Sequence, residues 1–189
     1  MTSYEHALKS VLGVTVDRAV LRTWIGRTLW DTFSAEWPEQ VGELVAAYRV
    51  WNEAHTPTGV TAYDGVPELV SDLVTAGIAT GVATAKVRPN AIASLHYAGI
   101  DLAVLVAAED TQQHKPDPAP LLLARQRLGM TTEPTVYVGD AVVDVLAAKA
   151  AGWDAIAVTW GAGEPDALRA ADPTAVATTV AELRALLLG

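Results

Sequence analysis

The sequence lacks cysteine, long apolar runs and basic clusters, and each absence excludes a class of protein. Without cysteine the 189-residue chain forms no disulfide and performs no thiolate chemistry, which fits a reducing cytoplasm. No apolar run approaches the roughly 18 residues that cross a bilayer, and the first residues show no secretory signal pattern. The chain has 13 basic and 22 acidic residues, a net charge of −9 and no basic run. Nucleic-acid and membrane partners are therefore not expected.

The composition allows one domain with a small accessory unit, and the pattern of the chain changes near residue 60. Half of the residues are hydrophobic, so a core can be buried. Residues 1–60 show only helical spacing, which predicts a small helical bundle. Its three apolar stripes are Tyr4, Ala7, Leu8 and Val11; Val20, Leu21, Trp24 and Ile25; and Val41, Leu44, Val45, Tyr48 and Trp51.

Residues 61–189 alternate between short apolar runs and helical segments. The apolar runs lack polar alternation and each is followed by a helix, which predicts an α/β domain with a doubly wound parallel sheet. The expected strands are 78–83, 102–107, 135–138, 155–159 and a weak one near 175. The expected helices are 67–76, 89–99, 118–128, 142–151, a short one from 165, and 180–188.

Polar side chains follow three of these strands. Thr84-Ala85-Lys86 follows the first, Glu109-Asp110 and then His114-Lys115-Pro116-Asp117-Pro118 follow the second, and Gly139-Asp140 with Asp144 follows the third. Because the carboxyl ends of parallel strands meet at one edge of a sheet, we expect these side chains to converge. A hydroxyl, a lysine and two carboxylates are the groups that hold a phosphoryl group and Mg²⁺.

These residues resemble three motifs of the haloacid dehalogenase (HAD) superfamily. Thr84, the Lys115-Pro116-Asp117-Pro118 run and Gly139-Asp140-x-x-x-Asp144 look like its motifs II, III and IV, in order and at similar spacing. The resemblance covers nearly the whole chain, and residues 1–60 look like the family's four-helix cap. Within the superfamily the chain is similar to phosphoglycolate phosphatases and the HAD-type pyrophosphatase, and segments 24–34 and 83–88 look closer to the latter.

The resemblance implies a role for each matching residue. Thr84 would bond the transferring phosphoryl group with help from the N–H of Ala85, and Lys115 would neutralise its charge. Asp140 would bind Mg²⁺, and Asp144 would support the metal shell or orient Lys115. Arg27 and Lys86 could meet the leaving group. The implied activity is Mg²⁺-dependent hydrolysis of a small anionic phosphate, such as phosphoglycolate, pyrophosphate or a sugar phosphate, through an aspartyl-phosphate.

The sequence departs from the family at its first motif, Asp-x-Asp-Gly-Thr, which supplies the nucleophile and the general acid. No Asp-x-Asp-Gly occurs, and the single Asp-Gly, Asp64-Gly65, follows no apolar strand. In the family the strand before this motif lies between the strands that here end at Thr84 and Val138. We expect those two strands to pair directly or to leave open edges, which favour aggregation. The resemblance would place Met1 inside the first cap helix.

Two explanations remain open. The chain could be shortened, or it could be a pseudoenzyme that binds phosphate or a protein partner without turnover; the codons upstream of Met1 would separate them. In either case residues 1–189 alone are predicted to be inactive. Two other α/β classes fit poorly. A response-regulator receiver needs paired acidic residues after its first strand, and Gly161-Ala162-Gly163-Glu164 is too short for a dinucleotide-binding motif.

Overall fold

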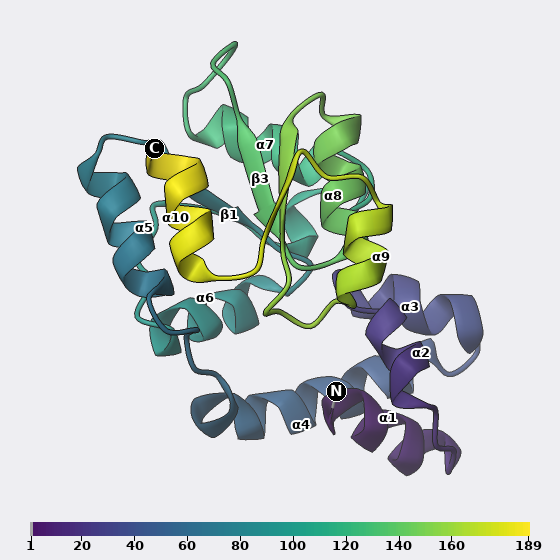
Figure 1. Ribbon diagram of the computed structural model, residues 1–189. Helices are drawn as coiled ribbons and strands as arrows, with labels where there is room; N and C mark the ends of the chain where they lie inside the picture. Colours follow the sequence, from purple (N-terminus) through teal and green to yellow (C-terminus); the bar gives the residue numbers. More distant parts are fainter. Residues whose placement is uncertain (1) are drawn as a thin grey trace.

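The N-terminal third of the chain is helical and has its own core. The computed structural model describes residues 2–189, and the side chains of all of these except residues 57 and 58; Met1, expected in the first helix, lies outside the described residues. The helices are α1 (Thr2–Leu12), α2 (Arg18–Thr23), α3 (Leu29–Glu36) and α4 (Val41–Gly59), grouped together in the lower part of Figure 1. We call residues 2–59 the helical part. Its core is built on Tyr4, Leu8, Leu21, Trp24, Phe33 and Leu44.

The rest of the chain alternates between helices and strands, as the sequence pattern predicts. The helices are α5 (Val66–Thr75), α6 (Arg88–Tyr97), α7 (Ala119–Arg127), α8 (Val142–Ala150), α9 (Pro165–Ala170) and α10 (Val180–Leu188), with a short 3₁₀ helix at Ala108–Asp110. The strands are β1 (Gly81–Ala83), β2 (Val104–Val106), β3 (Val136–Gly139), β4 (Asp154–Val158) and β5 (Ala175–Ala177). None of the helices in residues 2–189 is long and apolar enough to cross a membrane.

Helices cover both faces of the sheet that contains β4, and the fold is the predicted doubly wound α/β type. Successive residues of β4 show this division, because side chains alternate between the two faces of a strand. Ala155 and Ala157 pack in one core with residues of α7 and α8. Ile156 and Val158 pack in a second core with residues of α5 and α10. In Figure 1 α5 and α10 lie to the left and α8 and α9 to the right.

The parallel strands form two separate sheets. One contains β1 and β2, and the other contains β3, β4 and β5 in that order. Within residues 2–189, no backbone hydrogen bond joins β1 to β3. The sequence predicted that these two strands would either pair directly or leave open edges, and the structure shows open edges. A side chain joins these edges: the hydroxyl of Tyr137 on β3 donates to the carbonyl oxygen of Ala83 on β1 at 2.8 Å.

The first strand is shorter than the sequence predicted. The pattern indicated a strand from residue 78 to 83, but β1 begins at Gly81. Its ladder pairs Gly81 with Val104 and ends at Ala83 opposite Val106, so only three residues have a partner strand. Ile78, which the pattern placed in this strand, lies outside β1 and is 41% exposed.

Candidate active site

Lys115 and Asp144 form a buried ion pair at the carboxyl end of β3. The Lys115 Nζ atom lies 2.6 Å from Oδ1 of Asp144, and their side chains are only 7% and 6% exposed. The ammonium group also donates to the hydroxyl of Tyr137 at 3.0 Å. Oδ2 of Asp144 accepts the backbone N–H of Ala141 at 3.1 Å, at the start of α8. Both oxygens of Asp144 are thus bonded, and the residue is held in position to orient Lys115.

The charge of Lys115 is stabilised by these neighbours. Burial disfavours the ammonium form, but the contacts with Tyr137 and Asp144 outweigh this cost and raise the pKa of Lys115 above its usual value. For Tyr137, burial disfavours the charged phenolate and so raises the pKa of its hydroxyl, and the nearby Asp144 adds to this rise. At neutral pH the site therefore contains a fixed positive charge beside a neutral phenol.

Thr84 and Ala85 lie beside Lys115, as expected from their positions after β1. All three line one small enclosed cavity, together with Ala107, Ala108, Thr111, His114 and Pro120. The Thr84 N–H continues the strand ladder by donating to Val106 at 2.9 Å. Its hydroxyl oxygen accepts the N–H of Lys86 at 3.2 Å. Thr84 therefore orders the turn after β1 through its backbone N–H and its hydroxyl oxygen.

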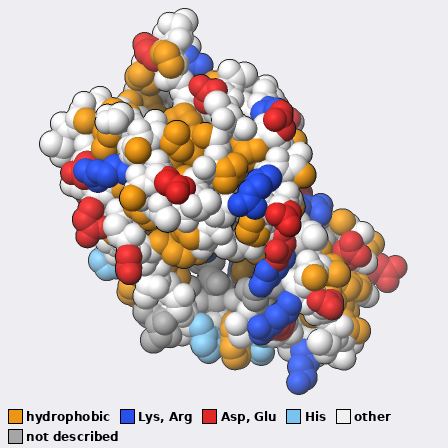
Figure 2. All heavy atoms as spheres, viewed as in Figure 1, with side chains coloured by type: hydrophobic (Ala, Val, Ile, Leu, Met, Phe, Trp, Pro, Cys, Tyr) orange, Lys and Arg blue, Asp and Glu red, His pale blue; other side chains and the backbone are white. Residues whose placement is uncertain are grey.

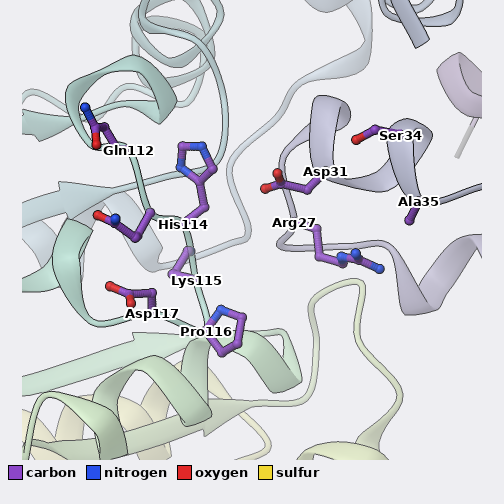
Figure 3. Close-up of a pocket in the computed structure, with 10 residues that line it drawn as sticks. Arg27, Asp31, Ser34, Ala35, Gln112, His114, Lys115, Pro116 and Asp117 are labelled. Carbon is purple, nitrogen blue, oxygen red and sulfur yellow. The ribbon is translucent and has the colours of Figure 1, made fainter. Parts of the chain in front are cut away.

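A larger open cleft separates the helical part from the loop that contains Lys115. Its volume is about 640 Å³, and its lining includes Arg27, Asp31 and Ser34 from the helical part and residues 112–117 from the loop. Figure 3 shows the Asp31 carboxylate directed toward His114, while the Arg27 guanidinium points away from it. The structure thus brings Arg27 to the same cleft as Lys115, although not into contact with it.

Asp140 follows β3 and is held by a different loop. Its Oδ2 atom accepts the N–H of Ala162 at 2.9 Å, and within residues 2–189 no hydrogen bond occupies Oδ1. Among these residues no cluster of three or more acidic or histidine side chains is suited to hold a metal. Mg²⁺, however, is commonly bound by one or two carboxylates together with waters and substrate phosphates. The half-buried Asp140, with one free carboxylate oxygen, fits that kind of site.

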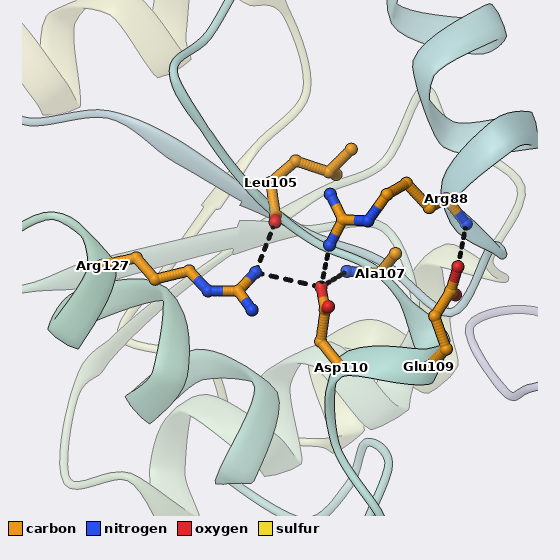
Figure 4. A network of polar contacts seen from close by, with 6 residues as sticks. All are labelled: Arg88, Leu105, Ala107, Glu109, Asp110 and Arg127. Atoms are coloured by element: carbon orange, nitrogen blue, oxygen red, sulfur yellow. Dashed lines mark hydrogen bonds and ion pairs between the residues drawn. The ribbon is translucent and has the colours of Figure 1, made fainter.

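Lys86 and the acidic pair after β2 lie apart from this group. Partial desolvation lowers the pKa of Lys86, although the residue keeps an exposed surface and lines neither cavity. Asp110 accepts the N–H of Ala107 at 2.8 Å and pairs with the guanidinium groups of Arg88 and Arg127. Figure 4 shows this network, in which Glu109 accepts the backbone N–H of Arg88. The network stabilises the turn after β2, so the contacts of Asp110 are structural.

Tyr137 and Asp31 are site residues that the sequence reasoning missed. Tyr137 stands in the apolar strand Val136-Tyr137-Val138, where a buried phenol needs a hydrogen-bond partner. This need could have indicated a place for Tyr137 in the site, because Tyr137 lies only three residues before the candidate ligand Asp140. Asp31 carried no comparable signal, since an acidic residue in the first turn of a helix is common.

Several known proteins are similar to this chain. The sequence model of the family described as haloacid dehalogenase-like hydrolase matches residues 1–158. The chain is 37% identical to the pyrophosphatase PpaX of Halalkalibacterium halodurans, over 97% of this chain and 86% of that protein. It is 31% identical to the pyrophosphatase PpaX of Bacillus pumilus, over 89% and 79%. The solved structure of a haloacid dehalogenase-like family hydrolase from Streptococcus pneumoniae superposes with a TM-score of 0.80 at 22% identity, covering 98% of this chain and 88% of that one.

Proposed function

The chain belongs to the haloacid dehalogenase-like hydrolase family, and from that premise we propose that its site binds a small anionic phosphate compound for phosphoryl hydrolysis. The Lys115 ammonium beside Thr84 and Ala85 carries this proposal. An ammonium group has three N–H donors. Asp144 and Tyr137 take two of them, which leaves one for a phosphoryl oxygen. The hydroxyl of Thr84 and the N–H of Ala85 would bond further oxygens of the same group.

The proposed substrate class is pyrophosphate or a similar small phosphate, such as phosphoglycolate or a sugar phosphate. The relatives named pyrophosphatase PpaX support pyrophosphate. In this proposal Arg27, which lines the cleft, would face the leaving group and complement its negative charge. Lys86 could meet the leaving group only by a change of position, because it lines neither cavity. The helical part would act as the cap over the cleft. The absence of cysteine supports a cytoplasmic location.

Mg²⁺ is part of the proposal because Asp140 offers a carboxylate oxygen of the kind this cation prefers. When bound, the cation would supply charge stabilisation to the phosphoryl oxygens. Asp140 would hold it through Oδ1, and Oδ2 would stay bonded to Ala162. Asp144 would support the metal shell indirectly, because its two oxygens already bind Lys115 and Ala141.

The family reaction proceeds through an aspartyl-phosphate. A carboxylate attacks phosphorus, the bond to the leaving group breaks, and water then hydrolyses the acyl phosphate. The 189 residues contain no Asp-x-Asp-Gly to supply that carboxylate. We therefore propose that these residues alone bind phosphate without turnover. A second candidate uses the same phosphate site, with Lys115 beside Thr84, but performs no catalysis.

Thermal unfolding with ligands tests the binding proposal. Mg²⁺ together with inorganic phosphate, pyrophosphate or phosphoglycolate should raise the Tm of residues 1–189, because a ligand that binds the folded state stabilises it. Asp140→Asn and Thr84→Val should reduce the rise. Asp166→Asn is the matched control, since Asp166 lies on the exposed side of α9. No rise in Tm with any of the three ligands would contradict the proposal.

An activity assay tests the statement about turnover. Residues 1–189 should not hydrolyse p-nitrophenyl phosphate in the presence of Mg²⁺. Hydrolysis that Asp140→Asn diminishes would show that the chain contains its own nucleophile. It would then contradict the proposed inactivity while leaving the family reaction intact.

A further inference from the structure

The glycine-containing loop between β4 and α9 wraps closely around Asp140. The loop contains Gly161, Ala162 and Gly163. A Cβ atom at position 161 would lie 2.2 Å from Oδ2 of Asp140, and one at position 163 would lie 2.0 Å from the Asp140 carbonyl oxygen. Only glycine allows this approach. Between the two glycines, the Ala162 N–H donates to Oδ2 at 2.9 Å.

We infer that this loop is a positioning element for Asp140 and that the helical part sets its position. This inference rests on the proposed role of Asp140 as a cation ligand. The loop fixes one carboxylate oxygen with a backbone donor and leaves Oδ1 for the cation. A donor that orients a ligand in this way resembles the outer-shell contacts that control metal affinity in other sites.

The helical part contacts the surroundings of Asp140 at two points. Glu164, directly after Gly163, forms an ion pair with Arg22 of α2. Figure 2 shows acidic and basic side chains side by side where α9 meets α2. At the second point Gly26 approaches Ala141 and Val143, so closely that a Cβ atom there would lie 2.6 Å from the Val143 side chain. A displacement of the helical part would therefore disturb the surroundings of Asp140 at two places, the loop that ends at Glu164 and the start of α8.

The first experiment replaces the loop glycines. Gly161→Ala and Gly163→Ala are compared with Gly42→Ala, a control in α4 where an added Cβ meets nothing within 4 Å. Binding of Mn²⁺, as a paramagnetic substitute for Mg²⁺, is measured by electron paramagnetic resonance, and circular dichroism checks folding. We expect the loop variants to bind Mn²⁺ about 10- to 100-fold more weakly than the control. Folded loop variants that bind as tightly as the control would overturn the inference.

The second experiment tests the link to the helical part without relying on a metal. Arg22→Gln and Glu164→Gln should each speed hydrogen exchange of the Ala162 amide by about 2- to 5-fold, the range expected for an exposed ion pair. The reversed pair, Arg22→Glu with Glu164→Arg, should restore the wild-type rate. Unchanged exchange in both single variants, or no restoration by the reversed pair, would overturn the link.

The two readouts separate failure of the inference from failure of the proposed function. If the wild-type chain binds no Mn²⁺, the proposed cation site fails. Amide exchange then still decides whether the loop is held by Asp140, because Asp140→Ala must speed exchange of the Ala162 amide. If that substitution leaves the exchange rate unchanged, the positioning role is wrong.

Discussion

The hydroxyl of Tyr137 on β3 donates to the carbonyl of Ala83 on β1 at 2.8 Å, and it joins two strands that share no backbone hydrogen bond. The same oxygen accepts a hydrogen bond from Lys115 at 3.0 Å. One side chain therefore connects both sheets to the lysine of the candidate site. The folding of the two sheets and the placement of Lys115 should depend on it together.

Removal of this hydroxyl should destabilise the protein. Tyr137→Phe leaves the Ala83 carbonyl and one N–H of Lys115 without their partner, which should lower the free energy of unfolding by about 1–3 kcal/mol. Urea denaturation followed by circular dichroism measures the change. Tyr63→Phe is the control, because Tyr63 is 52% exposed. Equal effects of the two substitutions would show that the bridge between the strands contributes nothing.

The buried pair of Lys115 and Asp144 should behave as a unit. Lys115→Met leaves the Asp144 carboxylate buried without a counter-charge, so we expect a loss of about 3–5 kcal/mol in the free energy of unfolding. Adding Asp144→Asn should recover part of this loss, since it removes the uncompensated charge. Denaturant unfolding of both single variants and the double variant forms a complete cycle. Additive losses would contradict coupling between the two residues.

The pH dependence of this pair follows from the raised pKa of Lys115. A group whose pKa is raised on folding contributes stability that is fully present below its unfolded pKa, about 10.4 for lysine. The contribution is lost only as the pH rises through the folded value. The difference between wild type and the double variant Lys115→Met with Asp144→Asn, which has no unpaired charge left at this site, should therefore stay constant from about pH 6 to pH 9, measured by the same unfolding assay.

Asp110 should make the protein sensitive to acid. Hydrogen bonds from Arg127, Ala107 and Arg88 hold the pKa of Asp110 well below its usual range, despite partial burial that acts in the other direction. A depressed pKa contributes stability above the unfolded value, about 3.9, and this stability is lost as the pH falls through the folded value. Asp110→Asn should cost about 1.5–3 kcal/mol of unfolding free energy at pH 7.

Urea unfolding at several pH values checks this expectation. The difference between wild type and Asp110→Asn should shrink steadily below about pH 4. Asp166→Asn serves as the control, because its partner Arg169 lies on an exposed helix turn. A difference that is independent of pH between 7 and 3 would show that the charge of Asp110 is not what stabilises the turn after β2.

The sequence predicted the elements well because their signals are local. Apolar runs followed by helical spacing place α5 to α10 and four of the five strands within a few residues. Thr84 and Lys115 were also expected to meet, because both follow parallel strands whose carboxyl ends share one edge. Their common cavity confirms that expectation.

Contacts between distant residues could not be predicted in the same way. The approach of Gly161 and Gly163 to Asp140 depends on how two loops pack, and a Gly-x-Gly pattern alone does not specify its neighbour. The length of β1 depended on its pairing, since a strand with a partner on one side keeps only the residues opposite β2. The bridge from Tyr137 to Ala83 likewise exists because β1 and β3 lie near each other without pairing.

The contact at Gly26 gives a last prediction, on how the helical part is attached. Gly26 has φ of +85°, and an added Cβ would lie 2.6 Å from Val143 and 2.8 Å from Ala141. Gly26→Ala should therefore cost the strain of a left-handed alanine, about 1–2 kcal/mol, and in addition the overlap with α8, about 1–3 kcal/mol. Gly13→Ala is a close control, because Gly13 has φ of +70° but nothing within 4 Å.

Comparison of these two variants isolates the packing contribution. Both variants should lose unfolding free energy through the strain of the left-handed alanine. Only Gly26→Ala should lose more, through its overlap with α8. Hydrogen exchange should rise at the start of α8 in Gly26→Ala while α1 and α4 keep their protection, because the helical part retains its own core. If both variants lose the same free energy and show the same exchange, then the helical part is not positioned by the contact between Gly26 and α8.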